Sequence, residues 1–190
     1  MSKITKSNFT KKLTVLYDTR EQENSHILKS AEEFGIKTER RKLDYGDYSF
    51  EHDGKNFSRL FVIERKASVD ELYGNFIPNP ARFEKEVYFA GNHAAHFAVL
   101  VEGVEGWDEL AATVVPEWEM KKTSRKVRTI GAKVYQKLRS WSCGNRYGFQ
   151  VEFVKRKDRS FARMLDIFYY CWRNYCIQSE PLKTAEDKND

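Results

Sequence analysis

The stretch that decides the fold is residues 46–70, GDYSFEHDGKNFSRLFVIERKASVD. Within it, residues 60–66 begin with the apolar run LFVI, whose β-branched and aromatic side chains predict a strand. The turn-rich residues 52–56 come just before this run, so we expect a hairpin whose first strand is residues 36–50. Residues 68–71, SVDE, have the Ser-x-x-Glu spacing of a capping box, which predicts a helix directly after the second strand.

Strands and helices alternate on both sides of this hairpin. Residues 13–17 and 96–101 are short, almost wholly apolar runs, which are typical of buried strands. Residues 149–154 alternate as a further strand. Apolar residues at helical spacing predict helices over residues 24–34, 80–91, 130–141 and 160–177. The sequence therefore predicts an α/β domain with a central, mostly parallel sheet that carries one antiparallel hairpin.

Glycine and proline mark the ends of several elements. Gly91 is expected to end the helix that Pro80 opens. Residues 103–128 contain Pro116 and two tryptophans in a long irregular stretch, which is typical of a functional loop or lid. The last helix is apolar nearly all round, so we expect it to be buried in the core of its own domain or against a second subunit.

Length and composition limit the class of protein. A chain of 190 residues fits one domain, which we assign to residues 12–177, between an N-terminal arm of residues 1–11 and a disordered tail of residues 178–190. With 41% hydrophobic and 32% charged residues, wholesale disorder and a membrane protein are both excluded. The start of the chain lacks a secretory signal and no apolar run is long enough to span a membrane. We therefore expect an intracellular location, in the cytoplasm or nucleoid if the source is bacterial or viral.

Basic residues are concentrated in one window. The net charge is +5, yet residues 121–163 hold 14 Lys or Arg against two acids, a local net charge of +12. Lys133 and Lys137 are spaced to share the exposed side of the helix predicted there. The window fits either a solvated helix face or a surface for DNA or RNA.

Four acids lie at the end or bend of a predicted strand: Asp18, Glu21, Asp47 and Glu64. The period of two along a strand puts Glu64 and Lys66 on one face, and the hairpin can bring Asp47 beside them. Two close carboxylates repel unless a proton or cation lies between them. Oxygen ligands with no nearby His or Cys favour Mg²⁺ or Mn²⁺, and this pattern fits metal-dependent phosphodiester hydrolysis.

These residues form a signature in which Gly-Asp is followed, after a spacer, by Glu-Arg-Lys, three residues and Asp. Here it is Gly46-Asp47, Glu64-Arg65-Lys66 and Asp70. In this signature the chain resembles the XPF-type structure-specific endonucleases, a branch of the PD-(D/E)xK nuclease superfamily. The upstream motif Asp-x-Arg-Glu matches residues 18–21, and residues 81–83, Ala-Arg-Phe, approximate the family's Gly-Arg-(Leu/Phe) motif.

The resemblance implies a fold and a metal site. The fold would be α/β, a three-layer restriction-endonuclease-like domain with a central mixed, mostly parallel sheet flanked by helices. Asp47 and Glu64 would be the main ligands of Mg²⁺ or Mn²⁺, with the carbonyl of Arg65 beside them. Asp18 and Glu21 would complete this site or hold a second ion.

The resemblance also implies roles for the basic residues. Lys66 would position the attacking water or stabilise charge, and Asp70 would orient the basic groups. Asp70 fits a helix start equally well, and Arg82 with Glu86 fits an exposed ion pair. The expected catalytic residues are Asp47, Glu64, Lys66, Arg65 and Asp70. The expected DNA-binding residues are Arg20, Arg65 and Arg82, which would contact or steer phosphate or brace the carboxylates, together with Lys133 and Lys137 of the basic window.

The leading hypothesis is a metal-dependent DNA endonuclease that cuts branched, flapped or otherwise discontinuous duplex DNA in repair, recombination or replication. One alternative is a catalytically silent DNA-binding scaffold, and another is a nuclease that acts on RNA or on strand ends. We expect a free-standing catalytic domain, without the helix-hairpin-helix domains of nuclear members. Its DNA affinity would come from the basic window, from a homodimer or from a different partner subunit.

Overall fold

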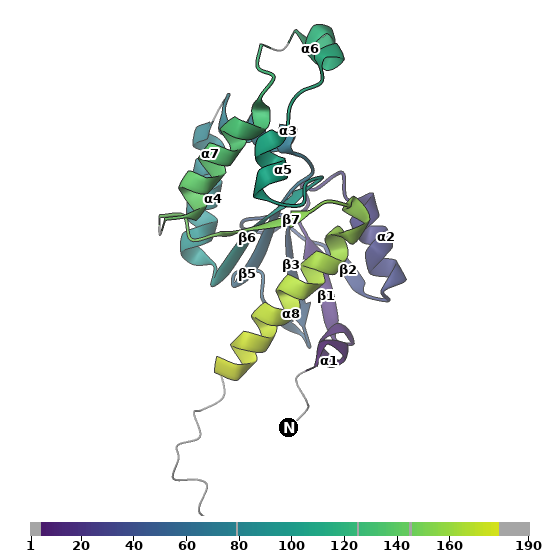
Figure 1. Ribbon diagram of the computed structural model, residues 1–190. Helices are drawn as coiled ribbons and strands as arrows, with labels where there is room; N and C mark the ends of the chain where they lie inside the picture. Colours follow the sequence, from purple (N-terminus) through teal and green to yellow (C-terminus); the bar gives the residue numbers. More distant parts are fainter. Residues whose placement is uncertain (1–4, 79, 125, 145, 179–190) are drawn as a thin grey trace, which may run out of the picture.

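The computed structural model describes residues 5–78, 80–124, 126–144 and 146–178 (Figure 1). The expected tail therefore lies outside the described residues, apart from Gln178. No described helix is both long enough and apolar enough to cross a membrane.

The described strands form one mixed sheet, in the order β2–β1–β3–β5–β6–β7, with β4 paired to β3. They are β1 (Leu13–Tyr17), β2 (Lys37–Arg40), β3 (Tyr48–His52), β4 (Lys55–Asn56), β5 (Phe61–Lys66), β6 (His96–Glu102) and β7 (Gln150–Val154). β1 pairs parallel with β2, and β5, β6 and β7 pair parallel in turn. β3 lies between β1 and β5 and is antiparallel to both. The prediction of a mixed, mostly parallel sheet is confirmed.

The prediction of a single strand over residues 36–50 is wrong. Its two halves, β2 and β3, lie on opposite sides of β1. The intervening residues 41–47 form a loop at the end of β1, where the carboxylate of Asp18 accepts a hydrogen bond from the Leu43 amide. Leu43 is buried even though it lies in a loop. The predicted hairpin does form, because Tyr48 of β3 pairs with Ile63 of β5.

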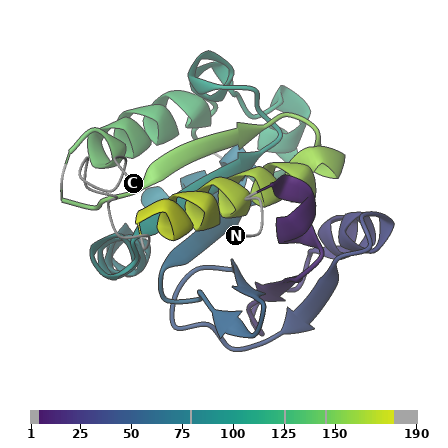
Figure 2. The ribbon, with the colours of Figure 1, turned by 90° about the horizontal axis from the view of Figure 1, so that it is seen from below.

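Helices cover both faces of the sheet, as the two views together show (Figures 1 and 2). One core cluster contains residues of α1 (Lys6–Thr10), α2 (Ser25–Glu33) and α8 (Ser160–Gln178). The opposite cluster contains residues of α3 (Val69–Phe76), α4 (Pro80–His93), α5 (Trp107–Ala112) and α7 (Ile130–Ser142). A 3₁₀ turn, Lys157–Arg159, leads into α8. The predicted three-layer α/β architecture is confirmed.

The two ends of the described chain pack together. Phe9, in the segment expected to be an arm, is fully buried and lies 5.0 Å from Trp172 of α8, between ring centroids. α8 buries one side, which includes Phe161, Leu165 and Phe168, while Tyr170 is 57% exposed. The helix thus packs largely within its own domain.

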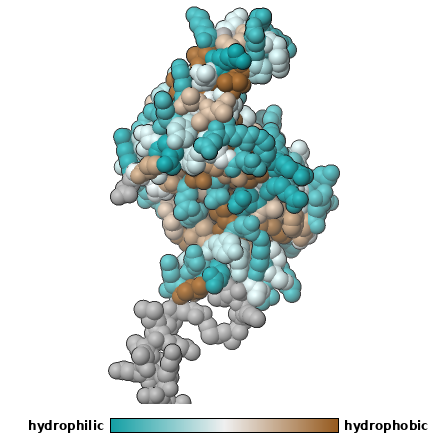
Figure 3. Space-filling view, in the orientation of Figure 1, coloured by the Kyte–Doolittle hydropathy of each residue, from teal (hydrophilic) through white to brown (hydrophobic). Residues whose placement is uncertain are grey.

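The segment predicted as a functional loop contains two short helices. α5 packs against α7 through Leu110, which is fully buried. The second helix, α6 (Glu117–Thr123), has no buried residue and stands off the body of the molecule (Figure 3). Its Trp118 is 66% exposed. A functional role for this segment stays a prediction.

Gly91 does not end its helix, which continues to His93. A Cβ atom on Gly91 would lie 1.5 Å from the carbonyl oxygen of Tyr147, so glycine is required here by close packing.

We expect Gly91→Ala to lower the free energy of unfolding by about 1–3 kcal/mol or more, as overpacking does. Chemical denaturation measures this, with Gly74→Ala as the control. Gly74 has open space around it, so its replacement in α3 should be neutral or stabilising. Equal stability of the Gly91→Ala and Gly74→Ala variants would contradict the packing argument.

Candidate active site

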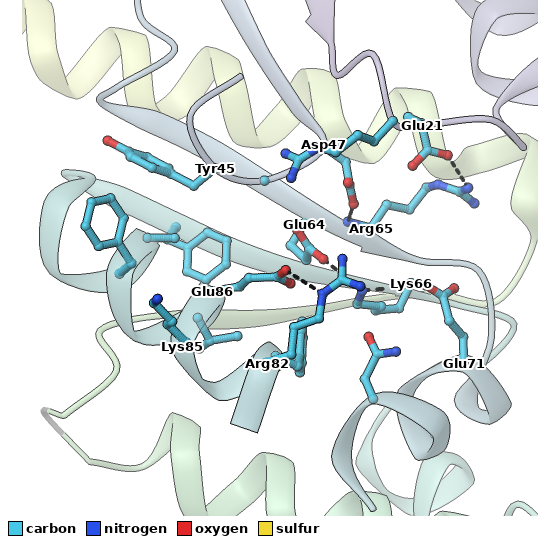
Figure 4. Close-up of a pocket in the computed structure, with 18 of the residues that line it drawn as sticks. Glu21, Tyr45, Asp47, Glu64, Arg65, Lys66, Glu71, Arg82, Lys85 and Glu86 are labelled. Atoms are coloured by element: carbon cyan, nitrogen blue, oxygen red, sulfur yellow. Dashed lines mark hydrogen bonds and ion pairs between the residues drawn. The ribbon is translucent and has the colours of Figure 1, made fainter. Parts of the chain in front are cut away.

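A cavity of about 790 Å³ lies between α4 and the sheet, beside β5. Its lining includes Asp47, which directly precedes β3, and Glu64 and Lys66 on β5. Arg20 lines it from the segment after β1 and Arg82 lines it from α4 (Figure 4). The cavity therefore combines carboxylates with several cations.

Asp47 is held in place by the backbone around it. Its amide donates to the carbonyl of Ile63, and its Oδ2 accepts a hydrogen bond of 2.8 Å from the Arg65 amide. The preceding Gly46 has a φ of +70°, and a Cβ there would lie 2.1 Å from Cγ1 of Val62. Glycine is thus required at position 46, because only glycine lets the chain turn this close to β5.

Glu64 and Lys66 share one face of β5, as the period of two predicts. The Nζ of Lys66 lies 2.8 Å from a carboxylate oxygen of Glu64 and 3.5 Å from one of Glu71. It also lies 4.6 Å from the centre of the Phe83 ring. Burial disfavours the ammonium, but the charges of Glu64 and Asp47 outweigh it and raise the pKa of Lys66. Lys66 is therefore a protonated donor at neutral pH.

Asp47 and Glu64 form a carboxylate pair whose negative charge is not fully balanced by the neighbouring cations. Burial, followed by the charge of Glu64, raises the pKa of Asp47 well above its usual value, despite the nearby Lys66. No group of three or more His, Cys, Asp or Glu residues that could hold a metal occurs in the described part of the chain. Two carboxylates nevertheless fit Mg²⁺, which usually keeps several waters and takes one or two protein carboxylates.

Arg65 points to the opposite side of β5, into a buried ionic network. Its guanidinium lies 2.6 Å from Glu21 and 2.9 Å from Glu102, and its side chain is 5% exposed. Burial lowers its pKa, but the hydrogen bond and charge of Glu21 outweigh burial and raise it. Between the two roles expected for Arg65, this geometry favours bracing carboxylates over contact with DNA.

Glu102 anchors this network, and the sequence reasoning missed it. It is fully buried at the end of β6 and also accepts hydrogen bonds from Ser160, at 2.6 Å, and from His26, at 2.9 Å. The sequence did carry a signal, because Glu102 directly follows the apolar run of residues 96–101.

Asp18 is fully buried, and its carboxylate is hydrogen-bonded to other parts of the protein. It accepts hydrogen bonds from the amide of Arg20, from the Arg20 side chain and from the amide of Leu43. Burial raises the pKa of Asp18, but these hydrogen bonds outweigh burial and lower it overall. Asp18 is not among the residues that line the cavity.

The structure brings most of the predicted site residues to the cavity and leaves others elsewhere. Those that line it are Arg20, Glu21, Asp47, Glu64, Arg65, Lys66 and Arg82. Asp70 lines a separate hollow with Val115 and Ile130. Lys133 and Lys137 lie on α7 and are not part of the cavity lining. Arg82 is paired with Glu86 at 3.1 Å, and its side chain is 81% exposed.

Comparison with known proteins identifies the family. The sequence model of the ERCC4 domain matches residues 17–164, well over half of the chain. The chain belongs to the ERCC4 domain family. The matched range contains the whole signature from Asp18 to Asp70, so the resemblance to XPF-type nuclease domains is confirmed.

Two solved structures share the ERCC4 domain fold of this chain. XPF from Aeropyrum pernix matches with a TM-score of 0.56 and 19% identity over 88% of this chain and 73% of that one. XPF from Aeropyrum pernix in complex with DNA matches with a TM-score of 0.53 and 17% identity over 88% of this chain and 74% of that one. A search of curated proteins finds no match. The family assignment makes this chain a domain of the nuclease and DNA-binding type.

Proposed function

We propose that this protein is a Mg²⁺- or Mn²⁺-dependent endonuclease that hydrolyses phosphodiester bonds of DNA. The observation that carries the proposal is the meeting of Asp47, Glu64 and Lys66 in one cavity. A carboxylate pair with an ammonium beside it suits hydrolysis of a phosphodiester, since cations are needed wherever negative charge develops.

Asp47 and Glu64 would hold the metal ion. When bound, the ion would supply a Lewis acid for the phosphate and a water of lowered pKa. Asp47 is oriented by the Arg65 amide, and Glu64 is fixed by its place on β5, so both carboxylates are organised in advance. Asp18 and Glu21 are better suited to support the metal ligands than to bind the ion themselves. Asp18 accepts a hydrogen bond from the loop of residues 41–47, and Glu21 forms an ion pair with Arg65.

The cations of the cavity would act on the phosphate. Lys66 can donate to the attacking water or to a phosphoryl oxygen and stabilise the charge that develops there. Arg20 and Arg82 line the same cavity from different elements and would bind phosphates to either side. Arg20 is 62% exposed in its side chain while tied to the buried Asp18, so its guanidinium is both oriented and reachable.

A branched or otherwise discontinuous DNA is the substrate class we propose. Membership in the ERCC4 domain family supports this class, and so does the fold shared with an XPF protein whose structure was solved with DNA. The basic window of residues 121–163 would supply further phosphate contacts, with Lys133 and Lys137 on α7 among them.

The experiment that tests the function compares end-labelled substrates. Single-stranded DNA, duplex, flap, fork, four-way junction and RNA are each incubated with Mg²⁺, Mn²⁺ or EDTA. We expect internal cuts in DNA in the metal lanes only, strongest near a discontinuity. DNA binding without any product in either metal would favour a catalytically silent scaffold. Preferential cutting of RNA or of strand ends would favour a nuclease that acts on RNA or on strand ends.

A further inference from the structure

One face of α4 carries a mixed row of basic and aromatic side chains along the cavity. Arg82, Lys85 and Phe89 lie three and four residues apart, so they share a face of the helix, and all three line the cavity. His93 continues this face, and its ring stacks on that of Phe89 with 4.0 Å between centroids. The row leads from the phosphate-binding end of the site to an aromatic end.

A second aromatic ring faces this end from the other wall. Tyr45 directly precedes Gly46 and Asp47, and its ring lies 5.9 Å from that of Phe89 in an edge-on arrangement. Its hydroxyl donates to the carbonyl of Arg59, at 3.0 Å, which fixes the ring. In Figure 4, Tyr45 lies toward one end of the cavity and Glu71 toward the other.

Phe89 is 47% exposed, although Val87 and Ala90 of the same helix are each only 1% exposed. Val87 and Ala90 of the same helix supply the core contacts instead. An exposed phenylalanine, braced by His93 and Tyr45, presents a flat apolar surface inside a cavity that also holds carboxylates and cations. Such a surface is suited to stack on a nucleic-acid base.

We propose that Phe89 and Tyr45 form a base-stacking subsite that receives an unpaired nucleotide of the DNA strand being cut. The inference rests on the proposed endonuclease function and narrows its substrate class. Bases inside an intact duplex already stack on one another, so they can reach this surface only after being unpaired. The subsite therefore favours DNA with an unpaired nucleotide next to the scissile bond over continuous duplex.

The length of the row indicates how far the unpaired nucleotide would lie from the phosphate bound by Arg82. Phe89 follows Arg82 by seven positions, which is about 10 Å along a helix that rises 1.5 Å per residue. A DNA strand advances about 3.4 Å per nucleotide. The stacked base should thus lie within about three nucleotides of the phosphate held at the Arg82 end, and Lys85 lies between the two to contact the backbone.

Binding assays in EDTA test the subsite without cleavage. The probes are a duplex with a short single-stranded gap, which carries the fluorescent base 2-aminopurine at the unpaired position, and a continuous duplex of the same length. The proteins are wild type, Phe89→Ala, Phe89→Trp and Tyr88→Ala. Tyr88 is the matched control, because it is a neighbouring aromatic of α4 that is 49% exposed and is absent from the cavity lining. Melting temperatures verify that each variant is folded.

We expect Phe89→Ala to weaken binding of the gapped DNA about tenfold, a loss of about 1.4 kcal/mol that is typical of one stacked base. Its affinity for the continuous duplex should change less than twofold. Phe89→Trp should retain tight binding and the quenching of 2-aminopurine, and Tyr88→Ala should behave as wild type. Together these results would support the subsite.

Other results would overturn the inference. An unchanged affinity of Phe89→Ala for gapped DNA would remove the stacking role, and an equal loss on both probes would show a role unrelated to unpaired bases. Either result leaves the endonuclease proposal intact if wild type still cuts DNA with Mg²⁺ or Mn²⁺. If wild type binds neither probe and cuts no DNA, the proposed function fails together with the subsite.

Discussion

Asp47→Asn is expected to slow DNA cleavage by about a thousandfold or more, on the scale seen when one group that stabilises a transition state is removed. The asparagine side chain keeps the size of aspartate and can still accept the hydrogen bond from the Arg65 amide. What it lacks is the charge that makes Asp47 and Glu64 a site for a divalent ion. Initial rates on a flap substrate with Mg²⁺ measure the effect.

Thermal melting supplies a second measurement on the same variant. In EDTA, Asp47 and Glu64 repel one another, so Asp47→Asn should melt at a higher temperature than wild type. Mg²⁺ should then raise the melting temperature of wild type more than that of the variant, because a ligand stabilises the protein only where it binds.

Asp44→Asn is the matched control for both measurements. Asp44 also lines the cavity, but its side chain is 56% exposed and pairs with Arg59. It should cut DNA at close to the wild-type rate. Full cleavage by Asp47→Asn, or the same loss in both variants, would contradict the role given to Asp47.

Glu102→Ala is expected to destabilise the protein by about 3–5 kcal/mol, the cost of breaking a buried ion pair. The substitution would leave the Arg65 guanidinium with only Glu21 as its charged partner and would remove the acceptor of Ser160 and His26. For a chain of this length the melting temperature should fall by about 6–20 °C. Calorimetry or circular dichroism measures the shift.

Glu105→Ala is the control for this prediction, because Glu105 is an exposed acid three residues further along the chain. It should melt within a few degrees of wild type, as surface substitutions do. Glu102→Gln keeps the shape and one acceptor oxygen, so it should lose less stability than Glu102→Ala. A Glu102→Ala protein as stable as wild type would show that the network does not hold β5 and β6 in place.

The order of strands and helices could be predicted from the sequence because most elements bury a regular apolar face. The exception is instructive. The expected strand of residues 36–50 includes the loop of residues 41–47, which the sequence does not reveal because Leu43 is buried there as it would be in a strand. In this loop the Leu43 amide donates to the carboxylate of Asp18, a side chain distant in sequence. A pattern within one segment does not contain such a contact.

The part of the site that depends on local geometry could also be predicted from the sequence. Glu64 and Lys66 lie two residues apart on one strand, so their shared face follows from local geometry. Glu102 and Phe89 contact residues that are distant in sequence. Only the packed structure brings Glu102 to Arg65 and Phe89 to Tyr45. Asp18 directly follows its strand as expected, but it binds the amides of Arg20 and Leu43 and does not line the cavity.

The most direct test of the central claim compares wild type with Glu64→Gln, purified side by side, on an end-labelled flap substrate with Mg²⁺, Mn²⁺ or EDTA. Glu64 lines the cavity and contacts Lys66, and its replacement by glutamine removes one charge with little change in shape. We predict cuts by wild type in both metal lanes, none in EDTA and none by Glu64→Gln, with both proteins binding the flap in EDTA. Equal cutting by Glu64→Gln, or cutting by wild type in EDTA, would contradict a metal-dependent nuclease site at Asp47, Glu64 and Lys66.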